Sequence, residues 1–169
     1  MGYNICGFIS NQSFNLIQPK LESVLGVHFE KEEIVTLSEA LSEKFGDLFL
    51  DVYDKKGVTM LFCDNILIPD EPKFSSLTQS GSSLVEFMLN DTSNVYAFRF
   101  YKNGQITDQE FYTFEPSFIC HGKNLLNLSE KDDIVERGIS HIIHPLIGAR
   151  FEDLKTSDKA LRVHFSLNR

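Results

Sequence analysis

The stretch SSLVEFMLNDTSNVYAFRFYKNGQITDQEFYTFE, residues 82–115, decides the fold that we expect for this chain. Near its centre stands Asn103-Gly104, a pair that favours a two-residue type I′ turn, because both central residues of that turn have positive φ. Runs of alternating side chains flank the pair, and a third apolar run, Ser83 to Leu89, precedes them. The stretch therefore predicts three consecutive antiparallel strands.

The predicted turn also fixes which residues face one another across the hairpin. Lys102 should face Gln105, and Arg99 should lie opposite Asp108, a match of opposite charges worth ~0.2–1 kcal/mol. Side chains alternate between the two faces of a strand, so Tyr96, Phe98 and Phe100 share one face. Three aromatic residues on one face predict the side of the sheet that packs on the core.

The remaining sequence predicts further strands and three helices. Strand patterns cover 3–9, 48–53, 58–63 and 161–167. Residues 27–35 are ambiguous: 27–29 could begin a strand, while 30–33 fit a loop or a helical turn. Helices are expected near 18–25, 36–45 and 130–143, the second opening with the capping-box spacing of Thr36 and Glu39. We expect an α+β fold, with one antiparallel sheet of five to seven strands and two or three helices mainly on one face. An α/β variant remains the alternative.

Length and composition indicate one globular domain, residues 1–169. The hydrophobic fraction of 42% and the aromatic fraction of 12% are typical of a chain that buries a core. No apolar run approaches the ~20 residues that a membrane-spanning helix requires. The N-terminus lacks the features of a signal peptide, so we expect a cytoplasmic protein without membrane contact.

Negative charge is concentrated in one third of the chain. Residues 21–71 hold 12 acidic and 4 basic residues, and their net charge of −8 equals that of the whole sequence. Such a field repels nucleic acid and attracts a basic protein. Within and beside this region, the connection 64–81 is long, and long connections are often functional. The acidic residues that we expect to contact a partner are Asp51, Asp54, Asp64, Asp70 and Glu71.

Signals for catalysis are weaker. The three cysteines are widely spaced and odd in number, which argues against disulfides and against a CxxC metal site. His141 and His144 are three residues apart and could share a helical face, with Cys120 as a further group of an alternative enzyme site. No nucleophile elbow, phosphate-binding loop or dinucleotide motif is present. We therefore assign no catalytic residue, no metal ligand and no cofactor.

These observations favour a non-catalytic, acidic module that binds a basic protein. A concrete version is an immunity-type protein that blocks a basic toxin or effector domain. The first alternative is a small hydrolase or metal-dependent enzyme that uses His141 and His144. The second is a structural subunit or homodimer that pairs through a sheet edge, and the oligomeric state stays open.

Overall fold

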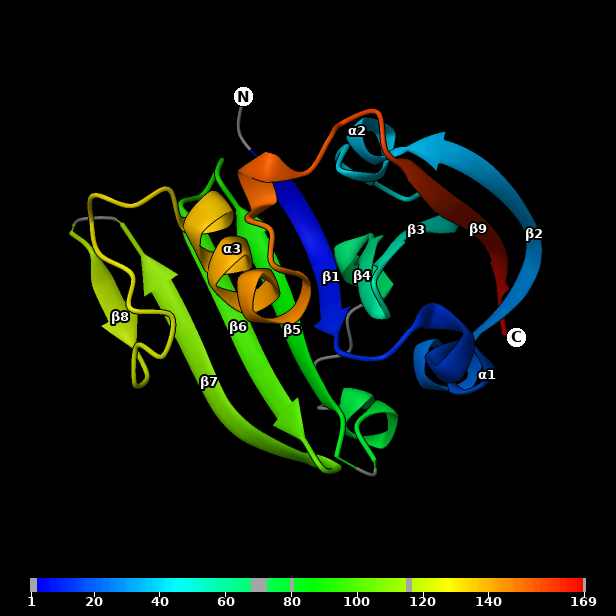
Figure 1. Ribbon diagram of the computed structural model, residues 1–169, viewed down its shortest axis with the longest axis horizontal. Helices are drawn as coiled ribbons and strands as arrows, with labels where there is room; N and C mark the ends of the chain where they lie inside the picture. Colours follow the sequence, from blue (N-terminus) through cyan, green and yellow to red (C-terminus); the bar gives the residue numbers. More distant parts are fainter. Residues whose placement is uncertain (1–2, 68–72, 80, 115–116, 169) are drawn as a thin grey trace.

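A computed structural model describes residues 3–67, 73–79, 81–114 and 117–168, and it contains one large antiparallel sheet. The nine strands follow the order β2-β9-β3-β4-β1-β5-β6-β7-β8, and every neighbouring pair is antiparallel. Figure 1 shows β8 and β2 at opposite ends of the sheet. The strands are β1 (Asn4–Ser10), β2 (Val27–Thr36), β3 (Phe49–Lys55), β4 (Val58–Cys63), β5 (Ser83–Asn90), β6 (Val95–Lys102), β7 (Gln105–Thr113), β8 (Ile119–His121) and β9 (Lys159–Leu167).

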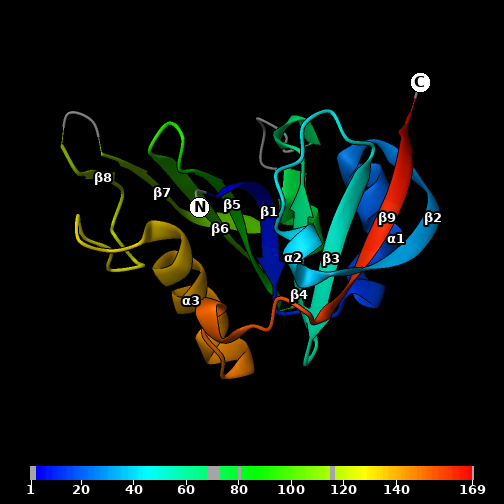
Figure 2. The same ribbon diagram turned by 90° about the horizontal axis from the view of Figure 1, so that it is seen from above.

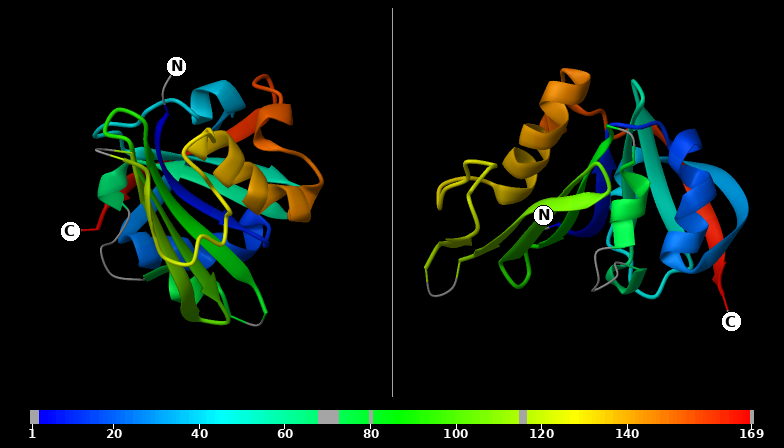
Figure 3. Two further views of the ribbon diagram at one scale, coloured as in Figure 1. Left: turned by 90° about the vertical axis from the view of Figure 1, so that its left-hand side faces the viewer. Right: turned by 90° about the horizontal axis from the view of Figure 1, so that it is seen from below.

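Three α-helices and three short 3-10 helices accompany the sheet in the part of the chain that the structure describes. The α-helices are α1 (Phe14–Leu25), α2 (Leu37–Ala40) and α3 (Ile134–Ile147), and the 3-10 helices are η1 (Asn65–Leu67), η2 (Lys73–Leu77) and η3 (Phe151–Asp153). Seen from above, α3 lies along the β5–β7 part of the sheet, and α1 lies near β2 and β9 at the other end (Figure 2). The view from below repeats this separation (Figure 3).

The sheet is buried on both faces at its centre. In β4 every residue is buried, and side chains alternate between two apolar clusters. Met60 and Phe62 join the cluster that contains α3, whereas Leu61 and Cys63 join the cluster that contains α1. Our prediction that the helices pack mainly on one face is therefore wrong. The unbroken apolar run VTMLFC carried this information, because a strand covered on both faces needs apolar residues at every position.

The predicted sheet of five to seven strands is also too small, since nine strands are present in the described residues. Two strands account for the difference. Residues 27–36 form a complete strand, β2, and the three residues of β8 add a short strand next to β7. The α+β class and the antiparallel pairing agree with the structure.

The hairpin of β6 and β7 forms around Asn103-Gly104 as predicted, and Lys102 faces Gln105. An irregularity between Phe100 and Tyr101 then shifts the pairing, so Arg99 faces Gln109 and the predicted match with Asp108 is wrong. Arg99 instead lies opposite Glu86 of β5, and its guanidinium nitrogen is 3.2 Å from that carboxylate. The bulge also brings Tyr112 against Phe98 on the core face.

Helix boundaries depart from the predictions for local reasons. Helix α1 begins at Phe14 rather than near residue 18, because the Asp54 carboxylate accepts a hydrogen bond from the Phe14 amide at 2.7 Å. The capping box of Thr36 and Glu39 forms as expected, but α2 ends at Ala40 instead of continuing to Phe45. Helix α3 continues through Pro145 and ends before Gly148, whose φ of 71° closes it.

Candidate functional site

Asp51 lies in the interior, on β3, with a side chain that is 0% exposed. Arg162, directly opposite on β9, donates to both carboxylate oxygens, from Nε at 2.8 Å and from Nη2 at 3.0 Å. The Lys44 ammonium lies 3.1 Å from the same carboxylate. This bidentate pairing satisfies a buried charge, so the Asp51 carboxylate makes its contacts inside the protein.

Lys44 connects this buried carboxylate to the loop 41–48. Its Nζ donates to the Ala40 carbonyl at 2.6 Å and to the Ser42 carbonyl at 3.1 Å. Burial lowers the pKa of Lys44, and the nearby Asp51 opposes that shift. The ammonium therefore fastens the beginning of the loop to the inside of the sheet.

Asp64 holds the same loop from another side. It is buried, and its carboxylate accepts a hydrogen bond from the Gly46 amide. At the end of the loop, the Leu48 carbonyl accepts from the Phe165 amide at 3.0 Å. Of the acidic residues expected to contact a partner, Asp51 and Asp64 thus lie inside and support the loop.

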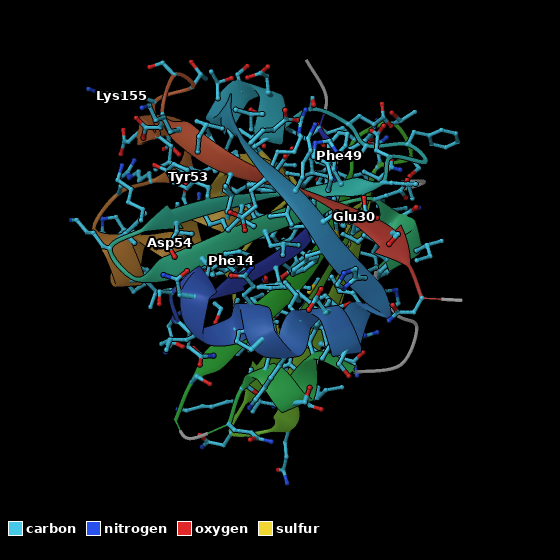
Figure 4. All side chains as sticks on the ribbon, turned by 90° about the vertical axis from the view of Figure 1, so that its right-hand side faces the viewer. Phe14, Glu30, Phe49, Tyr53, Asp54 and Lys155 are labelled. Atoms are coloured by element: carbon cyan, nitrogen blue, oxygen red, sulfur yellow. The ribbon has the colours of Figure 1, made fainter. Side chains whose placement is uncertain are left out.

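Asp54 is exposed, but it also has a local role at the start of α1. Figure 4 shows it beside Phe14, whose amide donates to its carboxylate. Asp70 and Glu71 lie outside the described residues. Partner binding by these residues stays a prediction, and the structure places further exposed acids on and near β2.

An exposed acidic surface follows β2, α2 and the loop after α2. We call it the acidic edge and define it as Glu30, Glu32, Glu33, Glu39 and Glu43. All five residues are exposed, and β2 forms one end of the sheet. Lys31 is the one Lys or Arg between 27 and 43, so with histidine neutral this segment alone contributes a net charge of −4. In Figure 4, β2 crosses this side of the molecule and carries Glu30.

The acids of the edge differ in their partners. Glu33 lies 2.8 Å from His164, and its pKa is lowered by that hydrogen bond. Glu39 belongs to the capping box of α2, and the hydrogen bonds from Thr36 lower its pKa. Glu30, Glu32 and Glu43 have no hydrogen-bond or ion-pair partner among the described residues. These three carboxylates are free to meet a cationic surface.

Sequence reasoning found the acidic region but not these residues. The run Glu30-Lys31-Glu32-Glu33 fitted a loop or a helical turn, so its position on a strand at the end of the sheet could not be seen. A mixed run of charges within a strand pattern is itself a signal of an edge, because charged side chains are rare on strands covered by neighbours.

The alternative enzyme residues separate into two places. His141 and His144 are both exposed on α3 and line one open groove of about 630 Å³, together with Glu136, Ser140 and Glu152. Cys120 does not join them, since it lies on β8. No cluster of three or more His, Cys, Asp or Glu side chains with metal-binding geometry occurs among the described residues.

The groove on α3 holds a polar contact that ties down η3. The Ser140 hydroxyl donates to the Glu152 carboxylate at 2.9 Å and accepts from the Phe151 amide at 2.7 Å. Burial and the nearby carboxylates of Asp133 and Glu152 raise the pKa of Glu136. Ser140 is thus engaged in holding the segment after α3, and among the described residues its hydroxyl makes no hydrogen bond to a histidine.

Comparison with known proteins gives no match to a protein-family model, to a curated protein or to a solved structure. Within the described part of the chain, no helix has the length and apolar character needed to cross a membrane.

Proposed function

We propose that this chain is a non-catalytic module that binds a basic protein through its acidic edge. One observation carries the proposal: within the described residues, Glu30 and Glu32 on the terminal strand β2 and Glu43 in the loop after α2 are exposed and have no hydrogen-bond or ion-pair partner. A patch of unpaired carboxylates attracts a surface of the opposite charge, so it favours a partner that supplies positive charge.

The physical effect of this surface is on encounter and specificity. A patch of one sign accelerates association with an oppositely charged protein and disfavours partners of the same sign. Nucleic acid and anionic lipid surfaces are therefore disfavoured partners. The small size of the chain and its localised acidity support the narrower proposal of an immunity-type inhibitor that covers a basic toxin or effector domain in the cytoplasm.

Affinity capture from the source lysate, at low and moderate salt, tests this function. The immobilised proteins are the wild type, Glu30→Lys, Glu32→Lys and the control Glu130→Lys, an exposed glutamate outside the acidic edge. We expect a basic protein that the wild type and the control retain at low salt and that moderate salt weakens. Against that protein once purified, each edge variant should bind ~3–10-fold more weakly, mainly through slower association.

Equal retention by all four proteins would contradict the acidic edge as the binding surface. Capture of no protein at either salt concentration would favour the enzyme alternative, with the groove on α3 as its site. In that case, metal analysis of the purified protein, followed by His141→Ala and His144→Ala, tests the enzyme alternative.

Pairing of two copies through β2 is a weaker proposal. The Glu22 carboxylate of α1 already accepts a hydrogen bond from the Phe29 amide at 2.5 Å, so this backbone donor of β2 is not available to a second strand. Antiparallel pairing of β2 with itself would also bring glutamates of two copies together, and like charges across a ladder are destabilising. Light scattering decides this point, because a dimer mass would support pairing and a monomer mass would end it.

A further inference from the structure

The loop 41–48, between α2 and β3, holds a phenylalanine side chain in water. Phe45 is 92% exposed, the highest value among the large hydrophobic residues that the described structure leaves at the surface. The helix predicted near 36–45 would have included Phe45, but α2 already ends at Ala40. The ring is therefore turned away from the core.

An exposed apolar residue is ordinary by itself. Phe45 differs because both of its neighbours in the chain are held by buried charged groups. Lys44 before it reaches Asp51 and two backbone carbonyls, and Gly46 after it donates its amide to the buried Asp64. The left-handed φ of 72° at Gly46 completes the turn that presents the ring.

This anchoring has a consequence for binding. The backbone on both sides of Phe45 is already held in place, so little backbone freedom is lost when the ring enters a pocket and more of its burial contributes to affinity. Aromatic residues are also enriched among the residues that dominate binding energy at protein interfaces. The loop thus resembles a fixed support for one hydrophobic contact.

Charge next to the ring defines the partner. Glu43 is exposed and Asp47 is half-buried, while the intervening cation, Lys44, is turned inside. Glu39 of the acidic edge lies on the helix that leads into the loop. A pocket that accepts the ring would meet these carboxylates at its rim, and lysine or arginine side chains there would pair with them.

We propose that Phe45 is the anchor of the interaction, entering an apolar pocket rimmed by Lys or Arg on a basic protein partner. This inference rests on the proposed function and deepens it. The acidic edge attracts and orients the partner, and the ring of Phe45 supplies the contact that keeps the complex together.

Site-specific photo-crosslinking tests the inference with a partner that is still unidentified. The probe is p-benzoylphenylalanine, placed in separate variants of the full chain at Phe45, at Lys31 of β2 and at Leu125. Substitution at Lys31 leaves all five glutamates of the acidic edge unchanged. Leu125 is an exposed hydrophobic control. Its amide donates to Glu110 of β7, so it lies far along the strand order from β2.

We expect irradiation in source cells to link positions 45 and 31 to the same basic protein, and position 125 not to do so. The peptide linked to position 45 should be apolar and flanked by Lys or Arg. With that partner purified, Phe45→Ala should weaken binding at least tenfold by faster dissociation. The midpoint of thermal unfolding of the Phe45→Ala variant should equal that of the wild type, because the ring is almost fully exposed.

Three results would overturn the inference. Linkage from position 31 alone would leave the proposed function standing and remove Phe45 as the anchor. Linkage from position 45 to a second copy of this chain would replace the basic partner with a dimer. Absence of linkage from both positions would count against the anchor and the proposed function together.

Discussion

Asp51 and Glu32 show how differently this protein uses acids from one part of its chain. Asp51 is fully buried on β3 and bonded to Arg162 and Lys44, whereas Glu32 is exposed on β2 and has no partner among the described residues. Yet β9 is the one strand between them in the described sheet. The interior acids hold the loop 41–48 in place, whereas Glu30, Glu32 and Glu43 of the acidic edge have no partner among the described residues. Acids from one part of the chain therefore form both the buried network and the surface proposed to bind a partner.

Asp51→Ala should have the largest effect on stability. It leaves Lys44 and Arg162 without their carboxylate in a buried place, which costs about 3–5 kcal/mol of unfolding free energy. Urea denaturation followed by circular dichroism measures the change, with Glu32→Ala as the control at an exposed acid. A loss below about 1 kcal/mol for Asp51→Ala would mean that the network is not structural.

Lys44→Met should have a smaller effect, about 1–3 kcal/mol, because Arg162 still pairs with Asp51 while the Ala40 and Ser42 carbonyls lose a donor. The same variant should loosen the loop around Phe45. Limited digestion with chymotrypsin, which cuts after aromatic residues, should show faster cleavage after Phe45 than in the wild type. Unchanged cleavage would show that Lys44 does not hold the loop.

Tyr53→Phe should reduce stability less, and in a pH-dependent way. The Tyr53 hydroxyl donates to Asp158 at 2.7 Å, and this hydrogen bond lowers the pKa of Asp158 from its ordinary value of 3.8. A carboxyl with a lowered pKa stabilises the fold above its unfolded pKa, and that stability is lost as pH falls through the folded pKa.

The difference in unfolding free energy between wild type and Tyr53→Phe should therefore be constant near pH 6 and shrink below about pH 3.8. Urea titrations at a series of pH values measure it. A difference that grew on acidification would reverse the sign and contradict the assigned hydrogen bond.

Glu32→Lys should have the smallest effect on folding, within about 0.5 kcal/mol, because the side chain is exposed and has no partner in the described part of the chain. The main effect that we expect from Glu32→Lys and from Glu30→Lys is weaker binding of the proposed basic partner. Thermal unfolding of the variant beside the wild type checks this expectation. A clear loss of stability would show that the acidic edge, like Asp51, is part of the structure.

The features that sequence reasoning predicted correctly depend on neighbouring residues. The turn at Asn103-Gly104 and the capping box of Thr36 follow from local backbone chemistry. The features that it missed depend on contacts distant in the sequence. Asp51 meets Arg162 only because β9, 111 residues further along, pairs with β3. The bulge after Phe100 equally could not be read from alternation, because one extra residue reverses the faces that follow.

The most direct test of the contrast between the two kinds of acid is carboxyl labelling with carbodiimide and glycine ethyl ester, mapped by mass spectrometry. In the free protein, Glu30, Glu32 and Glu43 should be modified, while Asp51 and Asp64 stay unmodified. Addition of the purified basic partner should protect the three glutamates and leave Glu130 fully reactive. Labelling of Asp51 in the folded protein, or equal labelling of the edge with and without partner, would contradict the account.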